Sequence, residues 1–417
     1  MPMPQIRLRH ASVPRSLMGW TLVDLAGRPR YWATVWSALE GAALAESTLS
    51  VRLASIDELY EATQRKFGRD CLDELIAKLD VEAIECSLEC LFVELRNRAA
   101  QRRTDTRATW RTAFGFVYSC LTRLAKSLKS IRTLDKLQAR LERLERLYKS
   151  LSPGKPRNPT FPRALPPTVL LELYALIDPL SNTNPFRTEP LRWRNYLLVL
   201  LLLHEGLRRS ETLVLPLDAL KPTRGSKNST GKRWLDIIEN SYEHDCRSQR
   251  PTLKNIFAVR QIPITDTIAR IYERYVNDFR PRKSPHSYLF LSQECAPLSK
   301  RAVNEVLRVV SSHLSRGSAQ ALREVMHKAA ITPHDLRHTC ACVRLKQFID
   351  SGDDMEMAMQ KLRSFFGWSR DSEMPRLYAR AYFEHQLSTT WNDSFDVHVD
   401  SMRALMPSGE AWYEKKA

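Results

Sequence analysis

The sequence predicts a mainly α-helical protein of two domains, with a small antiparallel β-sheet in the second domain. Between residues 31 and 151 apolar side chains recur at helical spacings of three and four, as at Leu53, Ile56 and Tyr60, and Gly and Pro are sparse. From residue 221 to 265 polar turns surround short β-rich runs, which indicates the sheet. A chain of 417 residues is long enough for two such cores.

Changes in composition divide the chain into five parts. Residues 1–30 are basic and contain prolines, so we expect a largely irregular arm. Residues 31–151 form the helical domain, and the basic face of its last helix is expected to point outward. A linker, 152–163, separates it from the second domain, 164–388. The tail, 389–417, carries much apolar surface, which predicts docking on its own subunit or on a neighbouring one.

The linker is the clearest boundary. Pro153, Pro156 and Pro159 lie close together and end any helix. The segment also contains Lys155 and Arg157, which we predict to run along the backbone of a polyanion, although a solvated tether is an alternative.

Charge and cysteine usage narrow the class of protein. The net charge is +17 and the sequence pI is near 9.6, which favours a polyanionic partner. Eight cysteines occur without a C-x-x-C pair, a pattern that favours reduced thiols in a cytoplasmic protein. The longest apolar run, 196–203, is too short to span a bilayer, and no signal peptide is visible.

The segment Ile331–Thr339 predicts an anion site. Thr332 is a good N-cap, and Asp335 completes a capping box, so a helix begins here. His334, Arg337 and His338 are spaced i, i+3 and i+4 and therefore share one face near the helix N-terminus. An arginine in this position recognises phosphate best.

Two other interpretations of this segment are open from the motif alone. One is a surface helix with scattered polar groups. The other is a metal-dependent phosphohydrolase built on His334-Asp335, which requires further His or Asp ligands that the sequence does not supply at compatible sites.

Other elements of the second domain place further charged and aromatic groups. A buried helix over 192–204 ends near Gly206, and Arg208 stands at the start of the next helix; of Arg208 and Arg209, one should face inward. Short strands are expected at 234–238 and 259–264, with Lys254 just before the second strand.

Near the C-terminal end of this domain a helix stops at Gly367, directly before Trp368. Pro375 then starts a helix in which Tyr378 and Tyr382 lie one turn apart.

Together, Gly206-Leu207-Arg208, His334-x-x-Arg337-His338, Gly367-Trp368 and Tyr378 resemble the motifs of the tyrosine recombinase (phage integrase) family, in the family's order. The resemblance covers roughly residues 160–395. It implies that the helical domain is a core-binding domain that clamps DNA, and that the second domain is the mixed α+β tyrosine-recombinase catalytic domain.

The resemblance also implies roles for six residues. The catalytic set is Arg208, Lys254, His334, Arg337, Trp368 and Tyr378. The two arginines would hold the phosphate, His334 would pass protons to or from the tyrosine, and Lys254 would protonate the leaving 5′-hydroxyl. Trp368 would donate its indole N–H to a phosphate oxygen. Tyr378 would be the nucleophile; the spacing from Trp368 is about one residue longer than usual, so Tyr382 remains an alternative.

The implied function is site-specific recombination or integration of DNA, as for a mobile genetic element. The enzyme would cleave and rejoin duplex DNA through a 3′-phosphotyrosyl intermediate, without metal or ATP, as a synaptic tetramer in the cytoplasm, associated with the nucleoid. The alternatives are a type IB topoisomerase and a DNA-binding protein with an inactive site. The target sequence, and the choice among integration, excision and resolution, do not follow from the sequence.

The charge balance predicts DNA binding that depends strongly on salt. For a protein that contacts about 6–10 phosphates, affinity should fall by about 10³–10⁵ between about 50 and 200 mM salt, because bound cations are released from the DNA. Gel-shift titrations over this range measure the slope, and a nearly flat plot of log affinity against log salt would contradict a DNA clamp.

Overall fold

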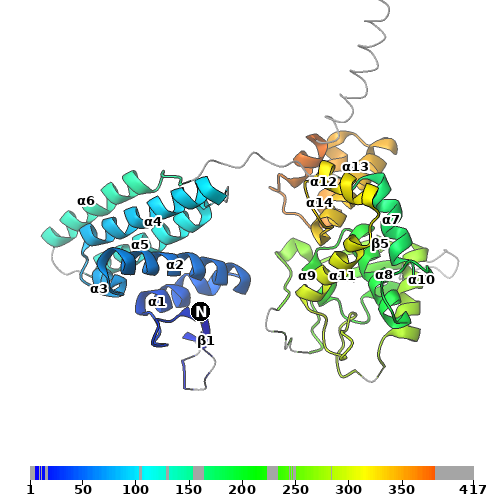
Figure 1. Cartoon of the computed structure of the whole chain (residues 1–417), viewed down its shortest axis with the longest axis horizontal. Helices are drawn as coiled ribbons and strands as arrows, with labels where there is room; N and C mark the ends of the chain where they lie inside the picture. The colour runs from blue at the N-terminus through cyan, green and yellow to red at the C-terminus, as the bar shows by residue number, and fades with distance from the viewer. Residues whose placement is uncertain are drawn as a thin grey trace, which may run out of the picture. The chain divides into compact units, whose positions relative to one another are not determined.

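The computed structural model describes residues 5–8, 10, 12–14, 17–102, 106–127, 131–153, 164–222, 233–243, 245, 247, 250–282 and 284–380. The chain divides into two compact units, 1–159 and 160–417, coloured blue to cyan and green to orange in Figure 1. The predicted linker cations Lys155 and Arg157, the alternative nucleophile Tyr382 and the tail lie outside the described residues. The assignment of the five parts to roles stays a prediction.

The first unit is a bundle of helices around one apolar core. Its helices are α1 (Tyr31–Leu39), α2 (Glu46–Phe67), α3 (Leu72–Ala77), α4 (Val81–Arg102), α5 (Arg107–Ser127) and α6 (Ile131–Tyr148), with a 3₁₀ turn at Gly41–Ala43. The residues that share the predicted spacing are the ones that pack inside: Leu53, Ile56 and Tyr60 of α2 are almost fully buried.

The basic arm contains a small sheet where we expected irregular chain. Strand β1 (Gln5–Leu8) pairs antiparallel with β2 (Gly19–Leu22). Contacts with the helices hold it in place: the Gln5 side chain donates to the Ser50 carbonyl at 3.0 Å, and Arg7 forms a 2.6 Å ion pair with Glu46. These partners are about 40 residues away in sequence, so the local pattern of the arm does not reveal the strands.

The second unit combines helices with a three-stranded sheet. Its helices are α7 (Pro167–Ile177), α8 (Glu189–Leu203), α9 (Arg209–Val214), α10 (Asp266–Arg274), α11 (Lys300–Ser312), α12 (Arg316–Met326), α13 (Pro333–Asp350) and α14 (Met355–Phe366); a π-helix, Tyr275–Phe279, continues α10, and residues 374–380 are also helical. The helical first unit and this mixed second unit confirm the predicted fold class.

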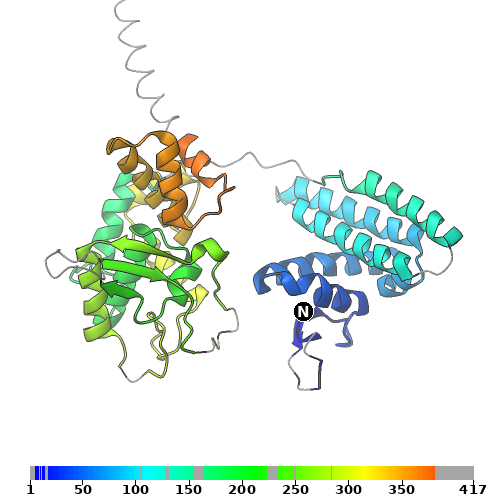
Figure 2. The same cartoon turned by 180° about the vertical axis from the view of Figure 1, so that it is seen from behind.

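The sheet of the second unit has the order β3 (Leu220–Pro222), β4 (Arg233–Ile237) and β5 (Arg260–Ile264), all antiparallel. Leu235 faces Ile262 across the β4–β5 pair, and both are buried in the core of the unit. Strands β4 and β5 match the two predicted strands, whereas β3 has only three residues. Strand β5 also contacts α14, the orange helix next to the green strands in Figure 2.

Helix α8 is buried on all sides, as its continuous apolar sequence predicts, and Leu197 to Leu203 all lie in the core. In the described part of the chain, no helix is long and apolar enough to cross a membrane.

After α8 the chain turns at Gly206, whose φ of +57° is in the left-handed region. The space beside Gly206 is filled by the Phe366 ring and by the Cys340 sulfur, 3.0 Å from the position of an added Cβ.

We predict that Gly206→Ala destabilises the second unit by about 2–5 kcal/mol. Roughly 1–2 kcal/mol comes from the left-handed backbone and about 1–3 kcal/mol from overpacking against Phe366. Hydrogen exchange of peptides from α8, α13 and α14 in the full chain measures the loss of protection. Gly352→Ala is a matched control, because Gly352 also has a positive φ, +92°, but faces open space. Equal losses in the two variants would show that packing at Gly206 contributes nothing.

Candidate active site

The N-terminus of α13 is fixed by the predicted capping box. The Thr332 hydroxyl accepts a hydrogen bond from the Asp335 amide, and the Asp335 carboxylate accepts one from the Thr332 amide at 2.9 Å. Asp335 is fully buried and also forms an ion pair with Lys328. Both oxygens of its carboxylate therefore already have partners at the helix start. This does not fit the phosphohydrolase interpretation, in which Asp335 would bind a metal ion. Among the described residues, no group of three or more His, Cys, Asp or Glu could hold a metal ion.

The first turns of α13 present His334, Arg337 and His338 on one face. The centres of the two imidazole rings are 4.0 Å apart, with an edge-to-face angle of 66°. Arg337 is buried, at 4% exposure, and points toward the turn after α8 and the end of α14. The predicted face therefore exists: Arg337 lies at its buried side, His338 is half-buried and His334 is exposed.

Two arginines meet at the C-terminus of α14. Arg337 donates to the Gly206 carbonyl and, at 2.7 Å, to the Phe366 carbonyl. Arg208, the N-cap residue of α9, donates to the Phe366 and Gly367 carbonyls at 3.4 and 3.5 Å. Carbonyls at a helix C-terminus have no partner within the helix and attract cations. The end of α14 therefore holds both guanidiniums at one place.

The Glu211 carboxylate neutralises part of this charge. It is fully buried and forms ion pairs with Arg208, with Arg260 at 3.1 Å and with Arg337 at 3.6 Å. Burial alone would raise the pKa of Glu211, but the three guanidiniums hold it below its ordinary value. Burial lowers the pKa of Arg337 to about 9, so Arg337 remains charged at neutral pH. Three cations around one carboxylate leave the cluster positive and suited to an anion.

Aromatic rings lie against the guanidinium of Arg337. Phe366 stacks on Trp368 with ring centres 4.8 Å apart, and Trp368 stacks on Tyr378 at 5.7 Å. The Arg337 guanidinium lies 4.8 Å from the centre of the Phe366 ring. The stack joins the end of α14 to the helical segment 374–380 that carries Tyr378.

The Tyr378 hydroxyl is buried beside the histidines. Its side chain is 1% exposed, and the hydroxyl shares a hydrogen bond with Nδ1 of His338. Burial raises the pKa of Tyr378 well above its ordinary range, and the nearby Arg337 and Arg208 only partly offset this. Burial, together with the neighbouring His334, lowers the pKa of His338 to about 4. Both groups are therefore neutral near pH 7 in this state.

Lys254 lies six residues before Arg260 in the sequence, and its side chain is exposed. It lies shortly before β5, and in the described part of the chain it is not among the groups that bond to the arginine cluster. The turn that follows it is packed against the site: Gly367 has a left-handed φ of +60°, and an added Cβ there would lie 2.7 Å from the Phe257 carbonyl. The structure thus brings five of the six predicted residues together, and Lys254 takes no part in their contacts among the described residues.

Three residues of the cluster received no role from the sequence. Glu211 is the third helical residue after the Arg208 cap, so the capping-box spacing is a signal that could have revealed it. His338 was placed on the correct face without a function. Arg260 lies on β5 and bonds across 105 residues to the Phe365 carbonyl at 2.7 Å, a contact that no local pattern indicates.

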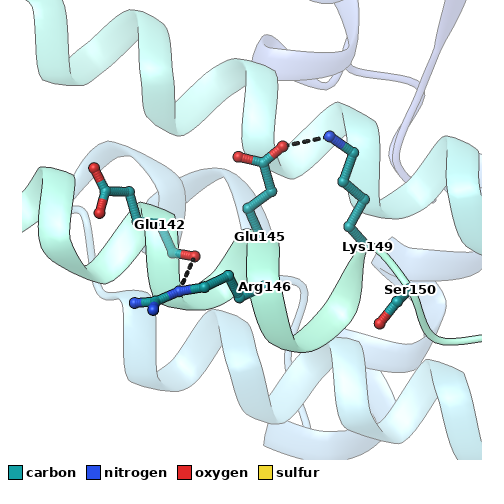
Figure 3. A pocket seen from close by; sticks show the side chains of 5 residues that line it. All are labelled: Glu142, Glu145, Arg146, Lys149 and Ser150. Atoms are coloured by element: carbon teal, nitrogen blue, oxygen red, sulfur yellow. Dashed lines mark hydrogen bonds and ion pairs between the residues drawn. The ribbon is translucent and has the colours of Figure 1, made fainter.

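A separate hollow on the first unit does not resemble the arginine site. Figure 3 shows its lining residues on and just after α6: Glu142, Glu145, Arg146, Lys149 and Ser150. Lys149 forms a 2.5 Å ion pair with Glu145, and Arg146 donates to the Glu142 carbonyl. The hollow contains two acidic and two basic side chains, so it offers no excess of either sign.

Comparison with known proteins identifies the family. The model of the phage integrase family matches residues 171–385, just over half of the chain, so the protein belongs to this family, as the motifs predict. Two solved structures are similar. A XerA recombinase has 14% sequence identity and a TM-score of 0.34, and the match covers 86% of this chain and 97% of that one. A XerH site-specific recombinase bound to difH substrate, in a pre-cleavage complex, has 15% sequence identity and a TM-score of 0.37, and the match covers 77% of this chain and 84% of that one. No curated protein matches.

We predict that Glu211→Gln destabilises the second unit by about 3–5 kcal/mol, because it leaves buried guanidiniums without their counter-charge. Hydrogen exchange of α9 and α14 peptides in the full chain reports the change. The control is Glu305→Gln, which removes an exposed i,i+3 ion pair with Arg308 and should leave exchange unchanged. Wild-type protection in Glu211→Gln would show that the carboxylate does not hold the cluster.

Proposed function

We propose that the protein is a site-specific recombinase or integrase that cleaves and rejoins double-stranded DNA through a 3′-phosphotyrosyl intermediate. One observation carries the proposal: Tyr378 stacks on Trp368, the Arg337 guanidinium lies 5.6 Å from the centre of the same Trp368 ring, and Arg208 shares the Phe366 carbonyl with Arg337. A nucleophile beside two fixed cations is the arrangement that attack on a phosphodiester requires. Membership of the phage integrase family supports the same function.

The arginines would bind the two non-bridging oxygens of the scissile phosphate. A guanidinium has five N–H donors in a planar fork, so bonds to carbonyls and to Glu211 leave further donors for a phosphate. Because α14 and Glu211 already fix Arg208 and Arg337, little rearrangement is needed as charge develops on the phosphorus oxygens.

In the proposed reaction the Tyr378 oxygen bonds to phosphorus as the bond to the 5′-oxygen breaks. The tyrosine proton passes to a base, and the leaving 5′-oxygen gains a proton from Lys254, whose exposed position suits contact with bound DNA. The sequence assigns the base role to His334. The phosphotyrosine conserves the energy of the phosphodiester bond, so rejoining by another 5′-hydroxyl needs neither metal nor ATP.

The proposed partners are duplex DNA and three further copies of the chain in a synaptic tetramer. The net charge of +17 supports DNA binding. The predicted DNA contacts of Lys155 and Arg157, and docking of the 389–417 tail on a neighbouring subunit, belong to this proposal.

We predict that Tyr378→Phe abolishes covalent capture of DNA and leaves DNA binding nearly unchanged, since only the nucleophilic oxygen is lost. The measurement is denaturing electrophoresis of protein mixed with a nicked suicide substrate, beside a gel shift on the intact site.

Tyr382→Phe is the matched control and should retain capture. An adduct with Tyr378→Phe but none with Tyr382→Phe would move the nucleophile by one helical turn. If wild type gives no adduct on any substrate, the protein binds DNA without cleaving it. Relaxation of supercoiled plasmid by the monomer, without paired sites, would favour a topoisomerase.

A further inference from the structure

The carboxyl group of Glu205 is buried and has no part in the proposed reaction. Glu205 lies in the turn between α8 and α9, directly before Gly206, and its side chain is fully buried. Among the described residues, neither of its two oxygens has a hydrogen-bond partner. An ionised carboxylate in such a place is costly, because a buried charge needs a close counter-charge and hydrogen bonds.

The arginine beside Glu205 is held by other contacts. Arg344 of α13 comes within 3.9 Å of a Glu205 oxygen, which is too far for a hydrogen bond. Its guanidinium donates instead to the His204 carbonyl at 3.2 Å and lies 4.8 Å from the centre of the Phe365 ring. Glu205 also follows the C-terminal end of α8, where the helix dipole disfavours a negative charge. These contacts favour the protonated, neutral form of Glu205.

We propose that Glu205 is a positioning residue: in its neutral form it lets the arginine cluster assemble, and its ionisation disturbs that cluster. The inference rests on the proposed function, in which Arg208 and Arg337 hold the phosphate. Two connections lead from Glu205 to these arginines. The carbonyl of the next residue, Gly206, accepts a hydrogen bond from Arg337. The second connection runs through Arg344 to the end of α14.

The end of α14 carries this second connection into the site. The carbonyls of Phe365 and Phe366 accept hydrogen bonds from all three arginines of the cluster. When Glu205 gives its proton to solvent, its charge attracts Arg344 away from its present contacts. Because Arg344 lies against the Phe365 ring, its movement shifts the helix end that positions the arginines. We therefore expect the ionised form to be poorly assembled for binding phosphate.

The neighbouring groups differ from Glu205 in the pH at which they change charge. Burial raises the pKa of Glu205 to about 7, and Arg344 only partly offsets this. Burial lowers the pKa of His204, whose Nε2 shares a 2.8 Å hydrogen bond with the Tyr174 hydroxyl of α7, and it raises the pKa of Tyr174. Burial raises the pKa of Cys340 on α13 to about 12. The arginines of α13 keep their charge, and α14 contributes uncharged rings. Among these described groups, Glu205 is therefore the one that changes charge near pH 7.

Hydrogen exchange tests the proton linkage without DNA. Full-length wild type is compared with Glu205→Gln, which keeps the shape of the neutral carboxyl but cannot ionise, between about pH 5 and about pH 8. Glu205 ionises near its ordinary value of 4.5 in the unfolded chain and near 7 in the folded chain, so its stabilising contribution is lost as the pH rises to about 7. Over this range, protection of α8 and α13 peptides in wild type should fall about 10–100-fold relative to Glu205→Gln.

Cleavage of DNA tests the link to the arginine cluster. Single-turnover formation of the covalent adduct on a nicked suicide substrate is measured for both proteins at about pH 6 and about pH 8. If only the neutral form is assembled, about one tenth of wild type is competent at about pH 8 and nearly all of it at about pH 6. Glu205→Gln should therefore match wild type at the lower pH and react about tenfold faster at the higher one. Glu305→Gln, an exposed change on α11, is the matched control and should equal wild type at both.

Arg344→Met tests the step that involves the arginine. Without this cation the ionised carboxylate of Glu205 has no counter-charge, so the fall in protection should occur at a higher pH than in wild type. A fall at the wild-type pH would show that Arg344 does not respond to Glu205 and would overturn this step.

The same pH dependence of protection in wild type and Glu205→Gln would overturn the inference, because the proton of Glu205 would then not be linked to folding. Equal cleavage rates at about pH 8, together with the expected change in protection, would also overturn it, because Glu205 would then act on stability alone. Absence of an adduct with either protein at both pH values would instead contradict the proposed function, while the exchange experiment would still decide the proton linkage.

Discussion

The ion pairs of the buried Glu211 carboxylate are the interactions on which the candidate site depends. Its three guanidinium partners come from the start of α9, from β5 and from α13, and without the carboxylate they would repel one another in a poorly solvated space. Because each arginine also bonds to carbonyls at the end of α14, the same contacts set the positions of the sheet and of three helices. The positive character of the site is therefore part of the packing of the unit.

Local patterns predicted much of this arrangement. The Thr332–Asp335 capping box, the turn at Gly206 and the left-handed end of α14 at Gly367 depend on neighbouring residues, so the sequence reveals them. The β1–β2 sheet and the bonds of Arg260 depend on partners 40 to 105 residues away, and no periodicity reports such pairings. The motifs selected Arg208, Arg337 and Tyr378 correctly as neighbours, but they did not show which histidine faces the hydroxyl.

Trp368 illustrates how one side chain serves packing and still suits a polar role. The face of its indole stacks on Phe366 and on Tyr378, with interplanar angles of 15° and 14°. The N–H group lies at the ring edge, so stacking does not consume the donor that the sequence assigned to a phosphate oxygen. The stack also keeps water from the tyrosine, which is why its hydroxyl relies on His338 for a partner.

The carbonyls of Phe366 and Gly367 have a consequence for how the protein is made. Arg208 precedes Phe366 by 158 residues and Arg337 precedes it by 29, whereas Tyr378 follows it. While residues 366–378 are inside the ribosome, the arginine cluster lacks the helix end that holds it, and Tyr378, the proposed nucleophile, is not yet available. A nascent or prematurely terminated chain therefore keeps basic residues of the cluster but lacks the tyrosine to which the proposed function assigns the attack on DNA.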